Sequence, residues 1–275
     1  MQKGTILITG CSSGIGFASA KVLKSRGWRV LATARSKDDL ARLECDLCVS
    51  AIRLELSETL SIAACAERAV DLADGRIDVL FNNAAYGQLG AVEDLSASVL
   101  RQQFEVNVIG GHDLTSRLLP QMRAQRAGRI VQCSSVLGLV SAPYRGAYCA
   151  SKFALEALTD SLRLELRDSG ISVSLIEPGP IRTRFLGSAL DRFMDTIDWQ
   201  GSVHRQVYEA RLRQLEAGGR QSFKLEPEAV VEKLVHAVES RRPKPRYFVT
   251  TPTFAADVMR RVLPTRLLDR FLLSQ

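Results

Sequence analysis

Short apolar runs alternate with longer amphipathic stretches along most of this chain of 275 residues. That order is typical of β–α units, which build a parallel sheet with helices on both faces. Right-handed crossovers between successive parallel strands leave few topologies for such a chain. The expected strands lie at 5–9, 29–34, 50–55, 77–81, 129–133, 172–176 and 246–249. The expected helices lie at 15–25, 37–44, 59–73, 96–122, 147–168 and 227–240.

The first expected strand leads into a glycine-rich turn. The sequence runs Thr9-Gly10-Cys-Ser-Ser-Gly14-Ile-Gly16 and continues as an amphipathic helix that stops at Gly27. Glycines allow a tight turn and close backbone approach, while the N–H groups and dipole of a helix N-terminus attract a phosphate. The spacing G-x-x-x-G-x-G differs from the G-x-G-x-x-G fingerprint. Its position between strand and helix nevertheless favours a nucleotide site over an ordinary β–α turn.

The alternation and the turn together predict an α/β fold. We expect a Rossmann-like, doubly wound parallel sheet of about seven strands with helices on both faces. No stretch rich in proline, glycine or serine divides the chain, and no internal repeat is visible. We therefore expect a single dinucleotide-binding and catalytic domain over 1–275.

Tyr148 and Lys152 stand four residues apart in an expected helix, so their side chains project from the same face. A phenol titrates near pH ~10. An ammonium group within about 4–6 Å favours the phenolate and brings that pKa toward neutrality, where acid–base catalysis is efficient. An isolated Y-x-x-x-K pattern is more often a core tyrosine beside a solvated lysine.

Four further motifs stand in register with the turn and with the Tyr148–Lys152 pair. They are Asn82-Asn83-Ala84, Asn107-Val-Ile-Gly110, Ser135 and Pro178-Gly179. In their order and spacing, residues 4–182 resemble a short-chain dehydrogenase/reductase. The surrounding residues are most similar to the subgroup that contains hydroxysteroid and retinol dehydrogenases, and to bacterial aldehyde or carbonyl reductases.

This resemblance implies reversible hydride transfer between a nicotinamide and a carbonyl or alcohol carbon. Tyr148 would donate or accept the proton, and Lys152 would lower its pKa and hold the nicotinamide ribose. Ser135, rather than its neighbour Ser134, would orient and polarise the carbonyl. Asn107 would keep a helix distorted and support a proton-relay water near the lysine. The implied cofactor contacts are Gly10, Ser12, Ser13, Gly14, Ile15, Gly16, Arg35, Glu55, Leu56, Asn83, Ala84, Tyr148, Lys152, Pro178, Gly179, Ile181 and Thr183.

The end of the second expected strand distinguishes the two dinucleotides. An acid there would bond the ribose 2′-hydroxyl of NAD and repel a 2′-phosphate. Residues 31–34 carry no acid, whereas Arg35, Ser36 and Lys37 can donate to a phosphate. We predict NADP(H) rather than NAD(H), with Asp38 and Asp39 at the start of the next helix.

Two positions depart from the family pattern. Ala85 replaces a glycine beside the cofactor, which is tolerable if its φ stays negative. Glu55 stands where an aspartate commonly meets the adenine, and its longer side chain makes that contact less certain.

Two segments lie outside the β–α alternation. Residues 183–226 lack a strand signal and are expected to form a helical substrate lid, with packing filler as the alternative. Residues 254–275 form an amphipathic C-terminal tail in which four arginines lie among apolar residues and Pro264 breaks the helix. This tail would either dock on the protein or a subunit partner, or lie on an anionic membrane as a peripheral contact.

Composition excludes several other classes. The net charge of +7 is dispersed and aromatic residues make up 6%, which argues against nucleic-acid binding. Six cysteines without a secretory signal indicate reduced thiols and a cytoplasmic protein. Cys45 and Cys48 have metal-ligand spacing but no second pair nearby, so no metal is expected. No apolar run reaches the ~18 residues that span a bilayer.

The leading hypothesis is an NADP(H)-dependent oxidoreductase for a hydrophobic aldehyde, ketone, or steroid- or retinoid-like substrate. Its hydrophobic character is inferred from the lid residues Phe185, Leu186, Leu190, Phe193, Met194 and Trp199. A 3-oxoacyl-carrier-protein reductase is the alternative enzyme, and a non-catalytic nucleotide sensor is the alternative class. The resemblance also implies a homodimer or homotetramer built on the helices at 96–122 and 147–168.

Overall fold

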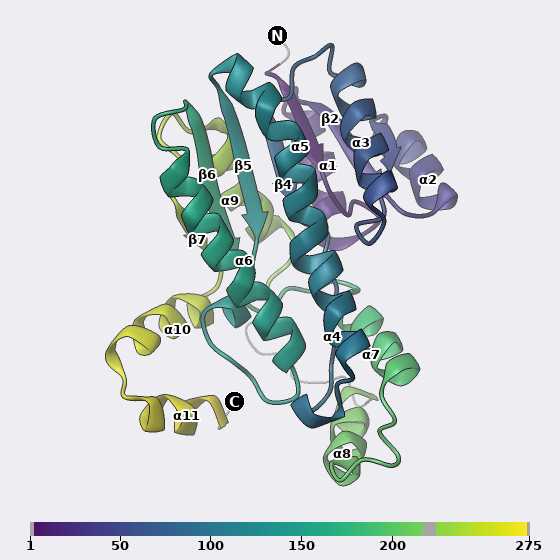
Figure 1. Cartoon of the computed structure of the whole chain (residues 1–275), viewed down its shortest axis with the longest axis vertical. Coiled ribbons are helices and arrows are strands. Elements are labelled where there is room, and N and C mark those ends of the chain that lie inside the picture. The colour runs from purple at the N-terminus through teal and green to yellow at the C-terminus, as the bar shows by residue number, and fades with distance from the viewer. Residues whose placement is uncertain (1–2, 217–223, 274–275) are drawn as a thin grey trace.

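Seven parallel strands form one sheet in the order β3-β2-β1-β4-β5-β6-β7 (Figure 1). The computed structural model describes residues 3–216 and 224–273. The strands are β1 Thr5–Ile8, β2 Arg29–Ala34, β3 Ser50–Arg53, β4 Val79–Asn82, β5 Gly128–Cys133, β6 Ile171–Glu177 and β7 Arg246–Phe248. The predicted doubly wound fold is confirmed, and all seven expected strands are present.

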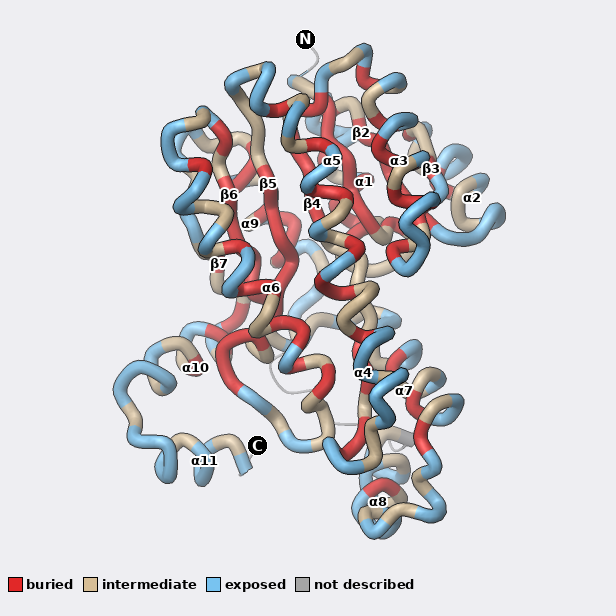
Figure 2. The backbone as a smooth tube through the Cα atoms, viewed as in Figure 1, coloured by how far each residue is buried: buried red, intermediate tan, exposed pale blue. Residues whose placement is uncertain are grey.

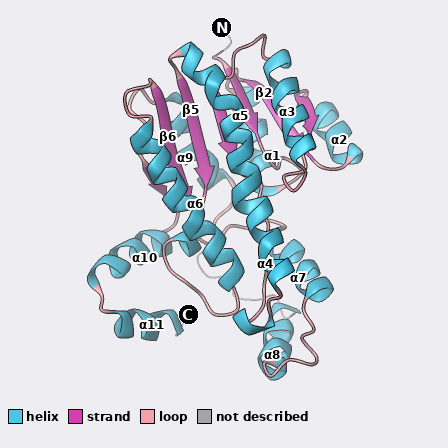
Figure 3. Cartoon of the chain, in the orientation of Figure 1, coloured by secondary structure: helices cyan, strands magenta, loops and turns pink. Residues whose placement is uncertain are grey.

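Helices cover both faces of this sheet (Figure 3). They are α1 Gly14–Ser25, α2 Lys37–Leu47, α3 Thr59–Leu72, α4 Ala97–Phe104, α5 Gly110–Gln125, α6 Gly146–Glu165, α7 Phe185–Thr196, α8 Arg205–Glu216, α9 Glu228–Glu239, α10 Thr251–Val262 and α11 Thr265–Leu273. None of the helices in the described ranges is long and apolar enough to cross a membrane.

Alternation along the strands divides the core into two clusters. Ile6 and Ile8 of β1 pack on one face with residues of α1, α2 and α9. Leu7 points to the other face, where it packs with residues of α3 and α5. Both faces are apolar because each is covered by helices, as in other parallel sheets. Figure 2 shows the resulting buried layer along the central strands.

The winding direction reverses between β1 and β4, which are neighbours in the sheet. Ile6 of β1 is in register with Val30 of β2 on one side and with Val79 of β4 on the other. The chain winds outward through β2 and β3 on one side and through β5 to β7 on the other. Ligands of open α/β sheets bind at the carboxyl ends of the strands beside such a reversal.

The helix expected over 96–122 is not regular. A π-helical turn, Glu105–Ile109, separates α4 from α5. A local amphipathic pattern predicts helix but does not specify how many residues each turn contains. The interruption depends on a contact of Asn107 with another segment.

The expected lid and tail are both helical. The lid contains α7 and α8, while residues 217–223 of the predicted lid lie outside the described residues. The tail contains α10 and α11 on either side of Pro264, where the break was predicted. Figure 1 places both pairs of helices beyond the carboxyl ends of the strands.

Candidate active site

The four candidate catalytic residues come from three elements that meet below β4 and β5. Tyr148 and Lys152 lie one turn apart on α6. Ser135 follows β5 and begins the short 3₁₀ helix Val136–Gly138. Asn107 lies in the π-helical turn. The fold therefore brings together residues that are up to 45 positions apart in the chain.

Lys152 ties α6 to the end of β5. Its side chain is buried, and its Nζ donates a hydrogen bond of 2.8 Å to the carbonyl oxygen of Cys133. The same Nζ lies 5.7 Å from the centroid of the Tyr148 ring. Burial lowers the pKa of Lys152, because the charged ammonium loses hydration.

The pKa of Tyr148 departs from the expected direction. Burial raises the pKa of its phenol, while a hydrogen bond with Ser135 and the charge of Arg145 only partly oppose this rise. The expectation that Lys152 brings the pKa of Tyr148 to neutrality is therefore wrong for this structure. Desolvation prevails, and the ammonium is directed toward Cys133. The phenol keeps its proton at neutral pH.

Ser135 and Ser134 point to different surroundings. Ser135 Oγ accepts a hydrogen bond of 3.1 Å from the N–H of Leu137 and shares a hydrogen bond with Tyr148. Ser134 is buried against Gly138, where an added Cβ would lie 2.8 Å from Ser134 Oγ. The structure thus places Ser135, rather than Ser134, beside the phenol.

Asn107 fixes the loop that follows β4. Its Oδ1 accepts from the N–H of Tyr86 at 3.0 Å, and its Nδ2 donates to the carbonyl of Tyr86 at 2.9 Å. The Nδ2 also donates to Ser151 Oγ at 3.2 Å. These bonds draw Asn107 out of a regular helix and coincide with the π-helical turn.

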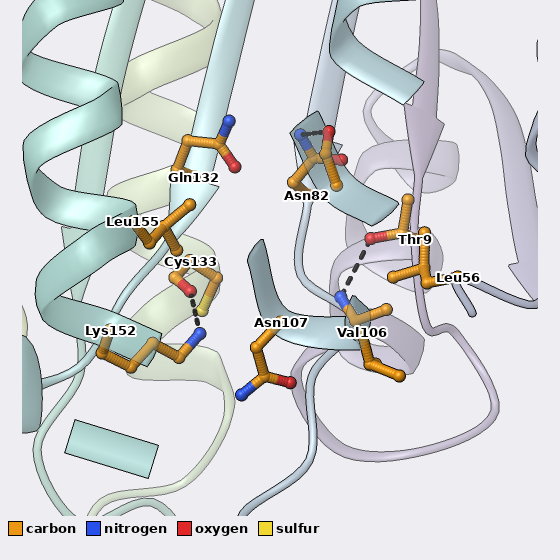
Figure 4. Close-up of a pocket in the computed structure, with 11 residues that line it drawn as sticks. Thr9, Leu56, Asn82, Val106, Asn107, Gln132, Cys133, Lys152 and Leu155 are labelled. Carbon is orange, nitrogen blue, oxygen red and sulfur yellow. Dashed lines mark hydrogen bonds between the residues drawn. The ribbon is translucent and has the colours of Figure 1, made fainter. Parts of the chain in front are cut away.

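Asn107 and Lys152 line a small cavity of about 10 Å³ (Figure 4). The side-chain oxygens of Asn82 and Gln132 are buried without a hydrogen-bond partner among the described residues, and both residues line this cavity. The volume is close to the minimum for one water molecule, and unpaired acceptors stabilise such a water. The surroundings therefore suit the relay water that the sequence implied beside Lys152.

The glycine-rich turn has the geometry that the sequence required. Gly10 and Gly14 adopt positive φ values of 72° and 55°. An added Cβ on Gly16 would lie 2.1 Å from the carbonyl oxygen of Gly10, so only glycine fits. Ser13 precedes α1 without a side-chain capping bond, and the first turn of α1 has no acidic residue. Its backbone N–H groups, which include that of Ile15, can therefore receive a phosphate.

Asn83 and Ala84 hold the segment after β4 against this turn. Asn83 Nδ2 donates to the carbonyl oxygen of Thr9 at 2.9 Å. Thr9 Oγ1 accepts from the backbone N–H groups of Asn83 and Ala84 at 2.8 and 2.9 Å. Ala85 is not among the residues with positive φ, as expected for alanine in place of glycine.

The end of β2 presents three exposed donors, Arg35, Ser36 and Lys37. Ser36 Oγ caps α2 by accepting from the N–H of Asp39 at 3.1 Å. Asp39 pairs with Arg42 at 2.8 Å and therefore acts at the helix start, as predicted.

Arg42 contacts the glycine-rich turn, which the sequence analysis did not predict. Its guanidinium donates to the carbonyl oxygen of Ser12 in the glycine-rich turn and lies 5.8 Å from the centroid of the Phe17 ring. The sequence signal at Arg42 is its spacing of three residues from Asp39, and this spacing predicts an ordinary ion pair within a helix rather than a contact with the turn.

Glu55 is engaged within its own turn. Its Oε1 accepts from the N–H and the hydroxyl of Ser57 at 3.1 and 2.9 Å. Leu56 lines the small cavity, and an added Cβ on Gly110 would lie 2.2 Å from the Leu56 carbonyl. Glu55 thus bonds to a residue of its own turn, and the expected contact of its side chain with the adenine stays a prediction.

The segment after β6 returns to the glycine-rich turn. The carbonyl oxygen of Pro178 accepts from the N–H of Val136 at 2.8 Å, and Ile181 forms an isolated bridge with Leu225. An added Cβ on Gly179 would lie 2.1 Å from Thr250 Oγ1, and one on Gly14 would lie 2.9 Å from Thr183 Cγ2. Thr183 therefore lies against the glycine-rich turn, whereas Gly179 packs against the start of α10.

Comparison with known proteins agrees with this geometry. A family model described as short chain dehydrogenase matches residues 4–192. Uncharacterized oxidoreductase YbbO of Escherichia coli (strain K12) is 46% identical over 272 residues, which cover 99% of this chain and 94% of that protein. This chain belongs to the short-chain dehydrogenase family.

Two further relatives extend the comparison. The 17-beta-hydroxysteroid dehydrogenase type 1 of Homo sapiens is 35% identical over 264 residues, which cover 91% of this chain and 78% of that protein. The crystal structure of a short chain dehydrogenase/reductase from Burkholderia phymatum in complex with NAD is 30% identical, with a TM-score of 0.79. That likeness covers 94% of this chain and 92% of that one.

The helix α7 of the predicted lid contacts the candidate catalytic tyrosine of this short-chain dehydrogenase. The ring centroids of Phe185 and Tyr148 lie 5.4 Å apart in an edge-on arrangement. An added Cβ on Gly87 would lie 2.9 Å from the Phe185 ring. The other apolar residues of the predicted lid differ in burial. Phe193 is buried in a small core that the lid helices form, whereas Met194 is 52% exposed. The apolar residues of the predicted lid thus include both packing and site-facing positions.

A buried ionic network lies behind the site of this short-chain dehydrogenase. Arg246 of β7 pairs with Glu156 of α6 at 2.5 Å, with Glu177 of β6 at 2.5 Å and with Asp160 at 2.6 Å. Burial and then the nearby charge of Glu156 raise the pKa of Glu177 to about 8, although Arg246 opposes the rise. The ion pair with Arg246 therefore offsets only part of the cost of burying the Glu177 carboxylate.

Proposed function

We propose that this protein is an NADP(H)-dependent reductase that transfers hydride between nicotinamide and the carbonyl carbon of a hydrophobic aldehyde, ketone, or steroid- or retinoid-like compound. The proposal depends on one observation above all. The Tyr148 phenol, whose pKa is raised by burial, is hydrogen-bonded to Ser135, and its ring lies 5.4 Å from that of Phe185 at the end of the sheet that carries the glycine-rich turn. Such a phenol can protonate a substrate oxygen as negative charge develops on it.

The residues of the crevice fit a dinucleotide. The backbone of Gly10 to Gly16 and the open N-terminus of α1 would hold the pyrophosphate. Lys152 and Tyr148 would hold the nicotinamide ribose, and the segment from Pro178 to Thr183 would border the ring. When bound, the dinucleotide supplies or accepts the hydride.

The proton chemistry favours reduction at neutral pH. Tyr148 retains its proton, which is the state that a carbonyl reductase requires. Ser135 orients the substrate oxygen toward the phenol. The ammonium of Lys152 borders the small cavity, so a water there can return a proton toward Tyr148 after turnover. Oxidation of an alcohol needs the phenolate and should gain from higher pH.

The preference for NADP(H) rests on the chain's own residues, since the Burkholderia phymatum relative was solved with NAD. Arg35 and Lys37 are exposed at the end of β2, where a 2′-phosphate would lie. Asp39 does not oppose them, because its carboxylate already accepts from the Ser36 hydroxyl and pairs with Arg42. A guanidinium can bind a phosphate through two parallel hydrogen bonds.

The hydrophobic substrate is inferred from the lid. Phe185 presents an aromatic edge to Tyr148, and the name of the human relative indicates a steroid substrate for that protein. A 3-oxoacyl-carrier-protein reductase and a non-catalytic nucleotide sensor are the alternatives. Oxidation of NADPH with a panel of aldehydes, ketones, steroids and an acyl thioester distinguishes these three.

We also propose that the protein is a homodimer or homotetramer that assembles through α5 and α6. A groove of about 180 Å³ runs between these helices and is lined by apolar residues that include Val108, Leu155 and Leu158. Leu158 is 44% exposed in the single chain, and Ile109, which follows Val108, is 48% exposed. A second copy would cover this apolar area.

The first prediction concerns the proton donor. Tyr148→Phe should lower kcat for aldehyde reduction by at least ~10²-fold, because general acid catalysis is lost. Binding of NADPH, followed by its fluorescence, should persist. Ser135→Ala should also reduce kcat, whereas the matched Ser134→Ala should keep most of it. Retained turnover in Tyr148→Phe would refute the assignment.

The second prediction concerns the cofactor. The unmodified protein should show a higher kcat/KM with NADPH than with NADH. Arg35→Ala should raise KM for NADPH by ~10-fold or more and leave KM for NADH within about 2-fold, because only the 2′-phosphate contact is lost. Arg68→Ala, on the exposed side of α3, is the control. A preference for NADH in the unmodified protein would overturn the proposal.

The third prediction concerns assembly. Leu158→Arg should shift the molar mass measured by light scattering from that of an oligomer to that of a monomer, because a charge would be buried at the interface. The control is Leu60→Arg on α3, where Leu60 is 86% exposed and lies outside the groove. An unmodified protein that is monomeric at micromolar concentration would contradict the proposal.

A further inference from the structure

The helix α10 faces the domain with its polar and small residues. Thr250 caps it by accepting from the N–H of Thr253 at 3.4 Å, and Thr253 and Ala256 are buried. Phe254, Val258 and Val262 follow one another at intervals of four residues and are 58%, 43% and 72% exposed. An ordinary surface helix buries its apolar stripe. In α10 that stripe is partly exposed, although the ring centroid of Phe254 lies 6.2 Å from that of Phe248 in β7.

The next helix, α11, is also exposed. None of the described residues of α11 is buried. Leu267 and Leu268 begin an apolar side, and Leu267 is 50% exposed. Arg266 and Arg270, four residues apart, share one side of the helix, and this side borders Leu267. We call the exposed part of Phe254, Val258, Val262 and Leu267, together with Arg266 and Arg270, the tail surface.

The charge around the tail surface is positive. The segment 251–273 contains four arginines at 260, 261, 266 and 270, and two aspartates at 257 and 269, which leaves a net charge of +2. Asp257 pairs with Arg261 at 3.1 Å. Arg266 and Arg270 are exposed beside the apolar residues.

This surface lies at the same end of the molecule as the candidate active site. Figure 1 shows α10 and α11 beyond the carboxyl ends of the strands, with α7 and α8 of the lid on the opposite side of that end. Figure 2 shows that α11 has no buried stretch. A flat surface that contacted the tail would therefore lie at the end of the molecule that carries the candidate active site.

We propose that the tail surface docks on the headgroup region of an anionic lipid bilayer. Apolar side chains flanked by arginines match the boundary between acyl chains and negatively charged headgroups. A symmetric contact between two copies of the tail surface would instead bring positive charges together. The charge thus favours a lipid surface over a second copy.

Docking in this position would bring the bilayer to the end of the molecule that carries the candidate active site. A hydrophobic carbonyl compound dissolved in lipid could then reach Tyr148 without crossing much water. This consequence rests on the proposed function, whereas the docking itself does not.

Co-sedimentation of the full-length protein with vesicles tests the proposal. The protein should pellet with vesicles of phosphatidylcholine and phosphatidylglycerol at low salt, and much less with phosphatidylcholine alone or at high salt. Arg266→Ala and Arg270→Ala should each weaken binding by about fivefold. Leu267→Asp should weaken it further, whereas the matched Leu60→Asp on α3 should bind like the unmodified protein.

A second measurement separates this proposal from the proposed function. Reduction of a short, water-soluble aldehyde should be unchanged in Leu267→Asp, because the tail surface lies outside the catalytic residues. Absence of pelleting with the anionic vesicles would overturn the docking, even if the enzyme is active. Equal pelleting of Leu267→Asp and the unmodified protein would also overturn it. So would a lowered molar mass of Leu267→Asp without vesicle binding, because the tail would then be a subunit contact.

Discussion

A buried ammonium group needs a hydrogen-bond acceptor, and the acceptor that Lys152 finds determines how the candidate active site is arranged. Its hydrogen bond to the carbonyl of Cys133 joins α6 to the last residue of β5. Ser135 follows two residues after Cys133, and Tyr148 precedes Lys152 by one turn, so this bond brings the serine and the phenol together. Loss of the bond would leave a buried charge unpaired, which is costly. The position of the proton donor thus depends on the packing of one helix against one strand.

The same end of the sheet gathers the other functional segments. Thr9 joins β1 to the loop after β4, and Thr183 contacts Gly14 of the glycine-rich turn. Arg246 connects the last strand to Glu177, which precedes the Pro178 segment. Thr250, at the root of the tail, touches Gly179. The tail surface and the candidate cofactor crevice are therefore connected through a few contacts between β6, β7 and α10.

Much of the fold could be predicted from the sequence because strand burial and helix amphipathicity are local patterns. The glycine-rich turn was predictable for the same reason, since Gly16 has no room for a side chain. The family resemblance implied a helix distorted at Asn107, but the π-helical form of that distortion was not predicted, because it depends on the contact of Asn107 with Tyr86 across the fold. Arg42 was missed because its contact with Ser12 is tertiary. The raised pKa of Tyr148 could not be foreseen, because the burial that causes it comes from packing around the phenol.

The central claim is that Tyr148 holds the proton for reduction at neutral pH. The most direct measurement is a spectrophotometric titration of the protein and of Tyr148→Phe, both without dinucleotide. The difference between the two curves reports the ionisation of this one phenol. We expect phenolate absorbance in the difference only above pH ~10, because burial outweighs the effects of Ser135 and Arg145. A step in the difference curve near neutral pH would contradict this assignment.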